Sequence, residues 1–339
     1  MPHVRVTERP DGVAICAPIY NDWPSALALL EQVDAMASTR PERFEVLLVD
    51  DGSTDPIPDR LVRLPSQVER VTILRLRRNL GHQRAIAIGL AHLHVLARHE
   101  AVVVMDGDGE DLPADIPKLL DRNHALGGSA IVFAQRAKRT EGWRFRLGYA
   151  CYRLLHSLLV GRNINVGSFS VVPRGSLARL VAVSELWNHY AAAVYHARLA
   201  IDLVPLNRAQ RLAGNSKMSF VTLVMHGLSA ISVYSDLVGV RVLRALALLA
   251  ALVVAGSIGT LAVRIFTPLE VPAWTTSAAG LLLVALLHLM ILSMFVAMFA
   301  LRARSGYSFL PLRDYSHFIL DEVPLYERAS VPANQVQYP

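Results

Sequence analysis

Residues 44–55, FEVLLVDDGSTD, and residues 101–111, AVVVMDGDGED, decide the fold class of this sequence. Each begins with a short apolar run that predicts a buried strand, and each continues into a cluster of Asp and Glu. The neighbouring segments predict two further strands and two helices, at 13–18, 71–74, 23–36 and 83–97. Largely apolar strands that alternate with helices predict an α/β domain with a mainly parallel sheet covered on both faces.

The two acidic clusters predict where a ligand binds, because open α/β sheets bind ligands outside the carboxyl ends of their strands. Carboxylates at alternate positions of an extended stretch project to one side, so Asp106, Asp108 and Glu110 are predicted to share one cation. Oxygen ligands of this kind favour Mg²⁺ or Mn²⁺. The alternative is an Asp/Gly turn in which the acids accept local backbone hydrogen bonds.

Two other nucleotide-binding fingerprints are missing from the sequence. No GxGxxG follows the first strand, and no GxxxxGK[ST] occurs, so neither the Rossmann nor the P-loop pattern applies. The chain has only 2 cysteines, Cys16 and Cys151, which excludes a disulfide scaffold and suits a reducing compartment.

Composition divides the chain into a soluble part and a membrane part. Only 18% of the 339 residues are charged, and residues 245–301 contain just two of these charges, Arg264 and Glu270. The charge-free runs 245–263 and 277–301 are long enough to cross a hydrocarbon core of roughly 30 Å as helices. They predict a transmembrane hairpin, and a lipid bilayer, rather than nucleic acid, is the simpler partner for the net charge of +6.

Flanking charges predict the orientation of the hairpin. Five arginines lie on its outer flanks, against Arg264 alone between the spans: Arg241, Arg244, Arg302, Arg304 and Arg313. This bias predicts both termini and the catalytic domain in the cytoplasm, at the inner membrane. Before the first span, polar residues recur every three or four positions over 218–237, which predicts an amphipathic helix lying in the membrane interface. A helix packed on the soluble domain is the alternative.

The motifs resemble family 2 glycosyltransferases with a GT-A fold, and in particular the polyprenyl-phosphate branch that includes dolichol-phosphate mannose synthase and the bactoprenol glucosyltransferases. The resemblance covers nearly the whole chain. It is carried by APIYND (17–22), VDDGSTD (49–55), RNLGHQRAIAIGL (78–90), MDGDGEDLP (105–113), the Arg-rich segment 136–153, VGSFSVVPR (166–174), RLAGNSK (211–217) and the two spans.

The resemblance implies roles for individual residues. The nucleotide sugar would be bordered by Pro18, Tyr20, Asp22, Asp51, Asn79, Gly81 and Asp106. Asp106 and Asp108 match the DxD motif, in which a metal bridges protein and donor diphosphate, and Glu110 replaces the Gln usual in the branch. The acceptor phosphate would be held by Arg136, Arg144, Arg146 and Lys217. The usual GDFRL becomes GSFSV, with Ser168 and Ser170 in place of Asp and Arg.

We therefore expect metal-dependent, inverting transfer of one sugar from a nucleotide sugar, with UDP-glucose as the default donor, to a polyprenyl phosphate. The alternatives are a catalytically silent membrane scaffold and a processive polysaccharide synthase; the second would need more spans and a QxxRW motif. The sequence leaves homo-oligomer formation open. The expected divisions are a catalytic domain (1–215), a juxtamembrane helix (216–240), the hairpin (241–304) and a cytoplasmic tail (305–339).

Overall fold

The computed structural model describes residues 12–58, 66–136, 157–158, 160–161, 166–206, 227–266, 274–305 and 309–328. The chain forms two compact units. The larger unit comprises Met1–Glu141, Ile164–Val233 and Phe309–Pro339, and the smaller comprises Gly142–Asn163 and Tyr234–Ser308. Apart from Arg136, the Arg-rich segment 136–153 lies outside the described residues.

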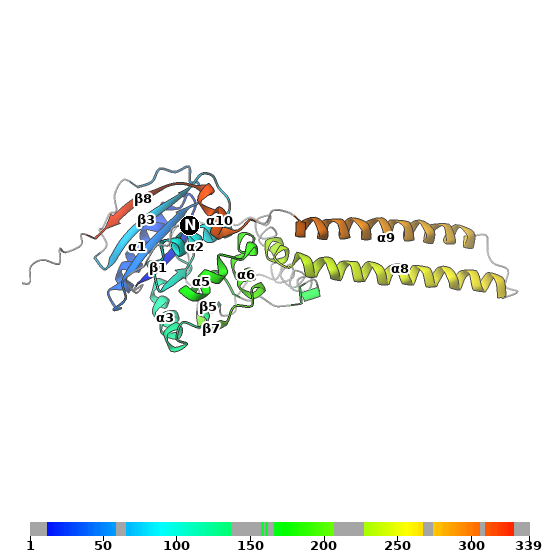
Figure 1. The fold of residues 1–339 in the computed structure, drawn as a ribbon, viewed down its shortest axis with the longest axis horizontal. Helices are drawn as coiled ribbons and strands as arrows, with labels where there is room; N and C mark the ends of the chain where they lie inside the picture. The colour runs from blue at the N-terminus through cyan, green and yellow to red at the C-terminus, as the bar shows by residue number, and fades with distance from the viewer. Residues whose placement is uncertain are drawn as a thin grey trace, which may run out of the picture. The chain divides into compact units, whose positions relative to one another are not determined.

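The larger unit is built on an 8-stranded sheet with the order β7-β5-β6-β4-β1-β2-β3-β8 in the described residues (Figure 1). The strands are β1 (Val13–Ile19), β2 (Phe44–Asp50), β3 (Val68–Leu76), β4 (Ala101–Val104), β5 (Ile131–Arg136), β6 (Ser170–Pro173), β7 (Ile201–Leu206) and β8 (Ile319–Glu327). Four neighbouring pairs are parallel, β1–β2, β1–β4, β2–β3 and β5–β7. The predicted α/β fold with a mainly parallel sheet is confirmed.

Helices cover both faces of the sheet, and β1 shows why. Val13, Ile15 and Ala17 pack in one core with α1 (Trp23–Ala37), whereas Ala14 and Cys16 pack in a second core with α2 (His82–Leu96). Alternate side chains of a strand point to opposite faces, so a strand buried on both faces must be apolar throughout. Further helical segments of this unit are η1 (Pro113–Asp115), α3 (Ile116–Ala125), α5 (Arg174–Leu180), η2 (Ser184–Trp187) and α6 (Tyr190–His196).

The chain returns to the larger unit after the hairpin. It forms α10 (Pro311–Asp314), η3 (Tyr315–Phe318) and then β8, which pairs antiparallel with β3. The prediction of a separate tail over 305–339 is therefore wrong for residues 309–328. The sequence of β8, ILDEVPLYE, has no clean alternation of apolar and polar residues, and only the exposed edge of β3 makes it a strand.

The smaller unit contains two long antiparallel helices, α8 (Ser235–Phe266) and α9 (Trp274–Ser305), which lie side by side (Figure 1). Each helix contains an 18-residue window that is not buried in the protein, with mean hydropathies of 2.4 and 2.6, and both helices are long and apolar enough to cross a membrane. The predicted spans 245–263 and 277–301 lie inside these helices. Both helices extend further because an α-helix continues through the charged residues that end an apolar run.

The predicted juxtamembrane helix is divided differently. Residues 227–232 are helical, 233–234 form a turn, and 235–240 already belong to α8, while residues 218–226 lie outside the described part of the chain. Ala230, Ile231, Val233 and Tyr234 are buried in the protein. For this described part, burial favours the alternative of a helix that packs on protein over one that lies on lipid.

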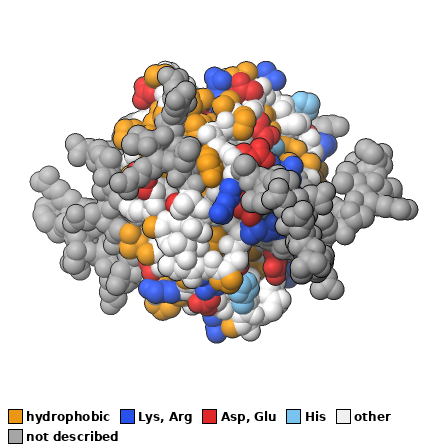
Figure 2. Space-filling view, turned by 90° about the vertical axis from the view of Figure 1, so that its left-hand side faces the viewer, with side chains coloured by type: hydrophobic (Ala, Val, Ile, Leu, Met, Phe, Trp, Pro, Cys, Tyr) orange, Lys and Arg blue, Asp and Glu red, His pale blue; other side chains and the backbone are white. Residues whose placement is uncertain are grey.

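The surface of the larger unit carries charges of both signs. On the face shown in Figure 2, basic and acidic side chains are interspersed with hydrophobic ones. Pairs such as Arg75–Asp321 (3.0 Å) and Arg70–Glu327 (2.5 Å) connect the exposed sides of β3 and β8. Exposed ion pairs of this kind contribute little to stability, so the pairing of β8 depends mainly on its backbone hydrogen bonds and on partly buried apolar residues.

Candidate functional site

Four parallel neighbours, β4, β1, β2 and β3, end at the same edge of the sheet, and the loops that follow them meet there. These loops are the 20–22 loop after β1, the 51–55 turn after β2, the 77–81 loop after β3 and the 105–112 turn after β4. All four contain residues that the sequence analysis assigned to a nucleotide sugar or a metal, among them Asp51 in the second. The candidate site is therefore a set of loops held by one rigid sheet.

Asn21 joins the first two loops. Its side-chain oxygen accepts the backbone N–H groups of Thr54 (2.8 Å) and Asp55 (3.2 Å), and its own N–H donates to Ser53 Oγ (2.9 Å). Its φ of 50° is left-handed, a conformation that Asn tolerates better than most residues. Sequence reasoning passed over Asn21, although an Asn between two strands and before a helix is a recognisable signal for such a turn.

The three predicted residues of the first loop differ in exposure. Pro18 is buried within β1, Tyr20 is 42% exposed, and Asp22 is half-buried just before α1. Their placement at the carboxyl end of β1 is compatible with a ligand there. Contact with a nucleotide remains a prediction.

Asp51 is a buried clamp between two loops. Its carboxylate is 3% exposed and accepts the backbone N–H groups of Leu80 (2.7 Å) and Gly81 (2.8 Å), one on each oxygen. Burial raises the pKa of Asp51, and the charge of Asp50 adds to this, while the two backbone donors lower it. The resemblance implied a contact with the nucleotide, but in this structure both carboxylate oxygens already accept backbone donors of the 77–81 loop.

Two glycines allow this close approach. Gly52 has φ +72°, and a Cβ there would lie 2.6 Å from the backbone of both Arg78 and Asn79. Gly81 has φ +95° and precedes the first turn of α2. Any larger residue at position 52 would therefore push the 77–81 loop away from Asp51, and Asn79, which is exposed, would move with it.

The second acidic motif forms a turn and not an extended stretch. β4 ends at Val104, the chain turns at Gly107 and Asp108, and Gly109 has φ +79°. Asp108 Oδ1 accepts the N–H of Glu110 (3.1 Å), and Asp111 accepts the N–H of Asp106 (3.1 Å). The assumption of alternating side chains is therefore wrong, because the glycines and the local hydrogen bonds fold the chain back within a few residues.

Asp106 is held by side chains from two other elements. The hydroxyl of Ser168 donates to Asp106 Oδ1 (2.5 Å), and Nε2 of His82 lies 3.2 Å from the same oxygen. Ser168 precedes β6 and His82 begins α2, so both contacts join segments that are far apart in the sequence. The Asp106 carboxylate is 19% exposed, which leaves it accessible at the edge of the sheet.

The acidic turn also changes the electrostatics of His82. Desolvation lowers the pKa of this imidazole, but the carboxylate of Asp106, helped by those of Asp108 and Asp111, raises it above its ordinary value overall. A protonated imidazole donates to a carboxylate and partly offsets the negative charge gathered in the turn. His82 was not among the predicted site residues, and the GHQ tripeptide was the available signal.

A buried chain of hydrogen bonds fixes the backbone of Ser168. Ser170, fully buried, donates to the carbonyl of Ser168 (2.9 Å) and shares a hydrogen bond with the hydroxyl of Tyr190 (2.6 Å). The N–H of Tyr190 in turn donates to the side-chain oxygen of Gln83 in α2 (2.7 Å). Burial raises the pKa of Tyr190, so its hydroxyl stays protonated. The two serines that depart from the usual GDFRL pattern thus form one supported unit.

The arrangement fits a divalent ion only in part. Among the described residues, no group of three or more His, Cys, Asp or Glu is arranged to hold a metal ion. The use of Asp106, Asp108 and Glu110 together as ligands of one ion stays a prediction. Two accessible carboxylates still fit a hard cation such as Mg²⁺, which usually takes one or two carboxylates and fills its other positions with water and substrate phosphate.

The predicted acceptor residues lie mostly outside the described part of the chain. This applies to Arg144, Arg146 and Lys217. Arg136 is the last residue of β5, where its backbone pairs in register with Leu206 of β7. Its role remains a prediction.

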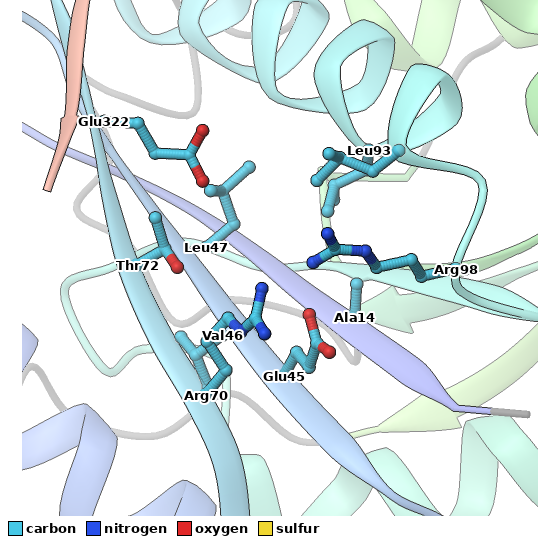
Figure 3. A pocket seen from close by; sticks show the side chains of 10 residues that line it. Ala14, Glu45, Val46, Leu47, Arg70, Thr72, Leu93, Arg98 and Glu322 are labelled. Carbon is cyan, nitrogen blue, oxygen red and sulfur yellow. The ribbon is translucent and has the colours of Figure 1, made fainter. Parts of the chain in front are cut away.

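A separate pocket lies near the opposite, amino-terminal ends of the strands (Figure 3). Arg70, Arg98, Glu45 and Glu322 line it together with the end of α2. The formal charges of its two basic and two acidic side chains cancel, and none of the predicted site residues lines it. The acidic loops, and not this pocket, therefore constitute the candidate site.

The sequence comparison identifies the domain. Residues 14–181 match the sequence profile described as Glycosyl transferase family 2. This range contains β1 except Val13, β2 to β6, all four loops of the site and the Ser168–Asp106 contact. The chain thus carries a domain of this family.

Several solved structures are similar to the chain. Mannosyl-3-phosphoglycerate synthase from Rubrobacter xylanophilus is 15% identical, with a TM-score of 0.47 over 66% of this chain and 73% of that one. Glucosyl-3-phosphoglycerate synthase from Mycobacterium tuberculosis, solved with Mn²⁺, UDP-glucose and phosphoglyceric acid, is 18% identical, with a TM-score of 0.47 over 68% and 80%. S. aureus TarS 1–349, in complex with UDP-GlcNAc, is 15% identical, with a TM-score of 0.44 over 68% of this chain and 66% of that one.

Proposed function

We propose that this chain, which carries a glycosyl transferase family 2 domain over residues 14–181, transfers one sugar from a nucleotide sugar to a polyprenyl phosphate. The observation that carries the proposal is the Asp106 carboxylate, held at the carboxyl edge of the sheet by Ser168 and His82, in a chain that also has two apolar helices of membrane-spanning length. UDP-glucose is the first donor to test.

The donor would lie across the loops that follow β1, β3 and β4. Pro18, Tyr20 and Asp22 would border one side of it, and Asn79 and Gly81 the other. Asp51 would act on the donor through the 77–81 loop, since its two oxygens hold the backbone of that loop. Rigid positioning of this kind lowers the entropic cost of aligning the sugar with its acceptor.

Asp106 and Asp108 would hold Mg²⁺ or Mn²⁺ beside the donor diphosphate. When bound, such an ion neutralises the negative charge that develops on the diphosphate leaving group. The hydroxyl of Ser168 and the ring of His82 keep the Asp106 carboxylate oriented toward the edge of the sheet. Structures of glucosyl-3-phosphoglycerate synthase with Mn²⁺ are consistent with this use of a divalent ion.

The acceptor is inferred from what stands at position 168. A hydroxyl acceptor needs a base to remove its proton, whereas a phosphate monoester already carries a charge of about −1.5 to −2 at neutral pH. Ser168 has no carboxylate to offer, and its hydroxyl proton is donated to Asp106. A phosphate oxygen that attacks the anomeric carbon as its bond to the nucleoside diphosphate breaks needs no base, and the configuration inverts.

Arg136 is proposed to clamp the acceptor phosphate, together with Arg144 or Arg146 and with Lys217. A planar guanidinium matches phosphate oxygens bidentately, which a lysine cannot do. Arg136→Lys is therefore expected to lose transfer at saturating donor while membrane association and donor affinity stay intact. An unchanged rate across the acceptor concentration range would remove Arg136 from the site.

The hairpin would bring the catalytic domain to the lipid phosphate at the cytoplasmic face of the inner membrane. In a background without Cys16 and Cys151, a cysteine at Thr275 is expected to react with an impermeant thiol reagent in intact cells. A cysteine at Ser330 is expected not to react. The reverse pattern would overturn the orientation.

The direct test is transfer by the purified full-length protein from a panel of radiolabelled nucleotide sugars. Polyprenyl phosphate and a water-soluble phosphate, 3-phosphoglycerate, would be offered as separate acceptors. We expect one labelled sugar to enter the organic phase with the lipid. Transfer only to 3-phosphoglycerate would refute the lipid acceptor, addition of many sugars would indicate a polysaccharide synthase, and no transfer or hydrolysis of any donor would indicate a silent scaffold.

A further inference from the structure

The segment that follows the hairpin contacts the candidate donor loop. The N–H of Arg77 donates to the carbonyl of Phe318 (2.9 Å), at the point where the 77–81 loop begins. Phe318 ends η3, and β8 follows it directly along β3. The start of the 77–81 loop is therefore bonded to residues that come after the second apolar helix.

An aromatic cluster makes a second connection to the same region. The ring of Trp187 in η2 lies 3.8 Å from the ring of Phe309 and 5.1 Å from that of Phe318, centroid to centroid, and the two phenylalanine rings are 5.5 Å apart. Phe309 and Phe318 are the first residue of the described return segment and the last residue of η3. The cluster thus joins the return segment to the helical part of the domain.

Arg84 connects this cluster to α2. Its guanidinium carbon lies 5.2 Å from the centroid of the Trp187 ring, and its Nη1 is 3.4 Å from the carbonyl oxygen of Leu80. A guanidinium over an indole ring is attracted by the negative face of the ring. Arg84 therefore bridges the aromatic cluster and the 77–81 loop.

Three consecutive residues in the first turn of α2 each bind a different neighbour. His82 contacts Asp106, Gln83 accepts the N–H of Tyr190, and Arg84 lies over Trp187. From the other side, Asp51 holds Leu80 and Gly81. The junction from residue 77 to residue 84 is thus fixed between the acidic loops on one side and the aromatic cluster on the other.

From these contacts we infer that Trp187, Phe309 and Phe318 are positioning residues for the donor site, which act through Arg84 and the 77–81 loop. This inference rests on the proposed function for its catalytic consequence, but its structural part does not. The return segment has a role in the site beyond completing the sheet. A chain that ends before Phe309 would lack both the edge strand β8 and two rings of the cluster.

The test compares variants of the cluster with a matched variant elsewhere on the return segment. Phe309→Ala and Trp187→Leu remove ring contacts, and Trp187→Phe keeps an aromatic ring. Tyr326→Ala is the control, because Tyr326 belongs to the same segment but packs against the core on the other face of the sheet. All four would be made in the full-length chain.

The first readout is amide hydrogen exchange, which needs no catalytic activity. Phe309→Ala and Trp187→Leu are expected to speed exchange over residues 77–85 about tenfold, or about 1.4 kcal/mol, without changing exchange in β1. Trp187→Phe should stay near the wild-type rate, and Tyr326→Ala should lower the thermal midpoint without this local change.

The second readout is the split between KM and kcat with the nucleotide sugar that the wild-type protein uses. The same two variants should raise the donor KM by about tenfold and leave kcat at saturating donor nearly unchanged, since they loosen the donor loop while the hydrogen bond from Ser168 still holds Asp106. Wild-type exchange over 77–85 in Phe309→Ala, or an equal change in Tyr326→Ala, would overturn the inference. If the wild-type protein transfers no sugar, the proposed function fails, and the exchange experiment still decides the positioning role.

Discussion

The acidic turn after β2 and the acidic turn after β4 hold their carboxylates in opposite ways. Asp51 in the first is 3% exposed, and both of its oxygens accept backbone N–H groups of the next loop. Asp106 in the second is half-buried, and its side chain is held by the side chains of Ser168 and His82. A buried carboxylate that accepts backbone N–H groups stabilises the fold. A carboxylate that is held by side-chain donors at an accessible edge is oriented to bind a ligand.

The largest expected effect is the loss of transfer activity when an acid of the turn after β4 is replaced. Asp108→Asn should abolish transfer, and Asp106→Asn should be similarly severe, with losses of at least about a hundredfold, because each removes a charged oxygen ligand where the diphosphate charge develops. Both variants should keep the wild-type thermal midpoint, since an amide oxygen can still accept the local hydrogen bonds. Asp121→Asn, in an exposed pair with Arg40, is the control. Near wild-type turnover of Asp108→Asn with Mg²⁺ or Mn²⁺ would contradict the metal assignment.

The matching change in the first turn should act on stability. Asp51→Asn turns an amide NH₂ toward one of the two backbone N–H groups that the carboxylate now accepts, at a cost of about 2–3 kcal/mol. We expect a clearly lower thermal midpoint, faster amide exchange at Leu80 and Gly81, and a weaker affinity for the donor. A stable Asp51→Asn protein that had lost only its nucleotide affinity would show that Asp51 contacts the nucleotide directly.

Ser168→Ala tests the side-chain support of Asp106 by itself. Removing a short hydrogen bond to a charged group leaves the carboxylate less well oriented, so the transfer rate should fall about tenfold, while the buried chain of Ser170 and Tyr190 keeps the fold. Ser168→Thr retains a hydroxyl and should recover much of the activity. Equal activity of wild type and Ser168→Ala would mean that this contact does not orient Asp106.

Asp34, at the other end of the sheet, is a second carboxylate that accepts backbone N–H groups, as Asp51 does. Burial raises the pKa of Asp34, but the backbone N–H groups of Ser66, Gln67 and Val68 and the Ser66 hydroxyl lower it overall. A carboxyl whose pKa is lowered by folding stabilises the fold above its unfolded pKa of about 3.9, and that contribution is lost as the pH falls through the folded pKa.

Thermal midpoints measured against pH give the test of Asp34. Asp34→Asn should cost about 1 kcal/mol at neutral pH, because the site is partly open to solvent, and the difference from wild type should shrink below about pH 4. Transfer activity at neutral pH should be unaffected. A difference that grew as the pH fell would contradict this sign.

The smallest effect is expected for Glu110→Gln. The backbone N–H of Glu110 donates to Asp108, and glutamine supplies the same donor. Transfer should stay within about twofold of wild type. A loss as large as that of Asp108→Asn would indicate that Glu110 is a third carboxylate ligand of the ion.

The fold was predictable where its signals are local. β1, β2, β4, α1 and α2 lie within a few residues of their predicted bounds, because runs of apolar residues and helical spacing depend only on neighbours in the sequence. β8 was not predictable from the sequence, because ILDEVPLYE has no regular alternation of apolar and polar residues and contains Pro324. It became a strand because β3 offers an unpaired edge.

The candidate site was predictable only as a set of motifs. Asp106 and Asp108 were recognised from their position after a strand, but the contact of Asp106 with Ser168 spans 62 residues of sequence. The assumption of an extended acidic stretch failed because glycine at positions 107 and 109 permits a turn that local hydrogen bonds then close. Asn21 and His82 were passed over because their importance lies in what they contact.

The sequence by itself determined the class of this protein: the alternation of strands and helices, acidic loops at strand ends, and two charge-free helices long enough to span a bilayer. These properties follow from periodicity and composition, which act over a few turns of chain. Only the tertiary structure decided that Asp51 clamps a loop, that Ser168 and His82 orient Asp106, and that residues 309–328 return to the sheet. Each of these depends on partners brought together from distant parts of the chain, and the free energy of such contacts is set by burial and geometry that no local pattern contains.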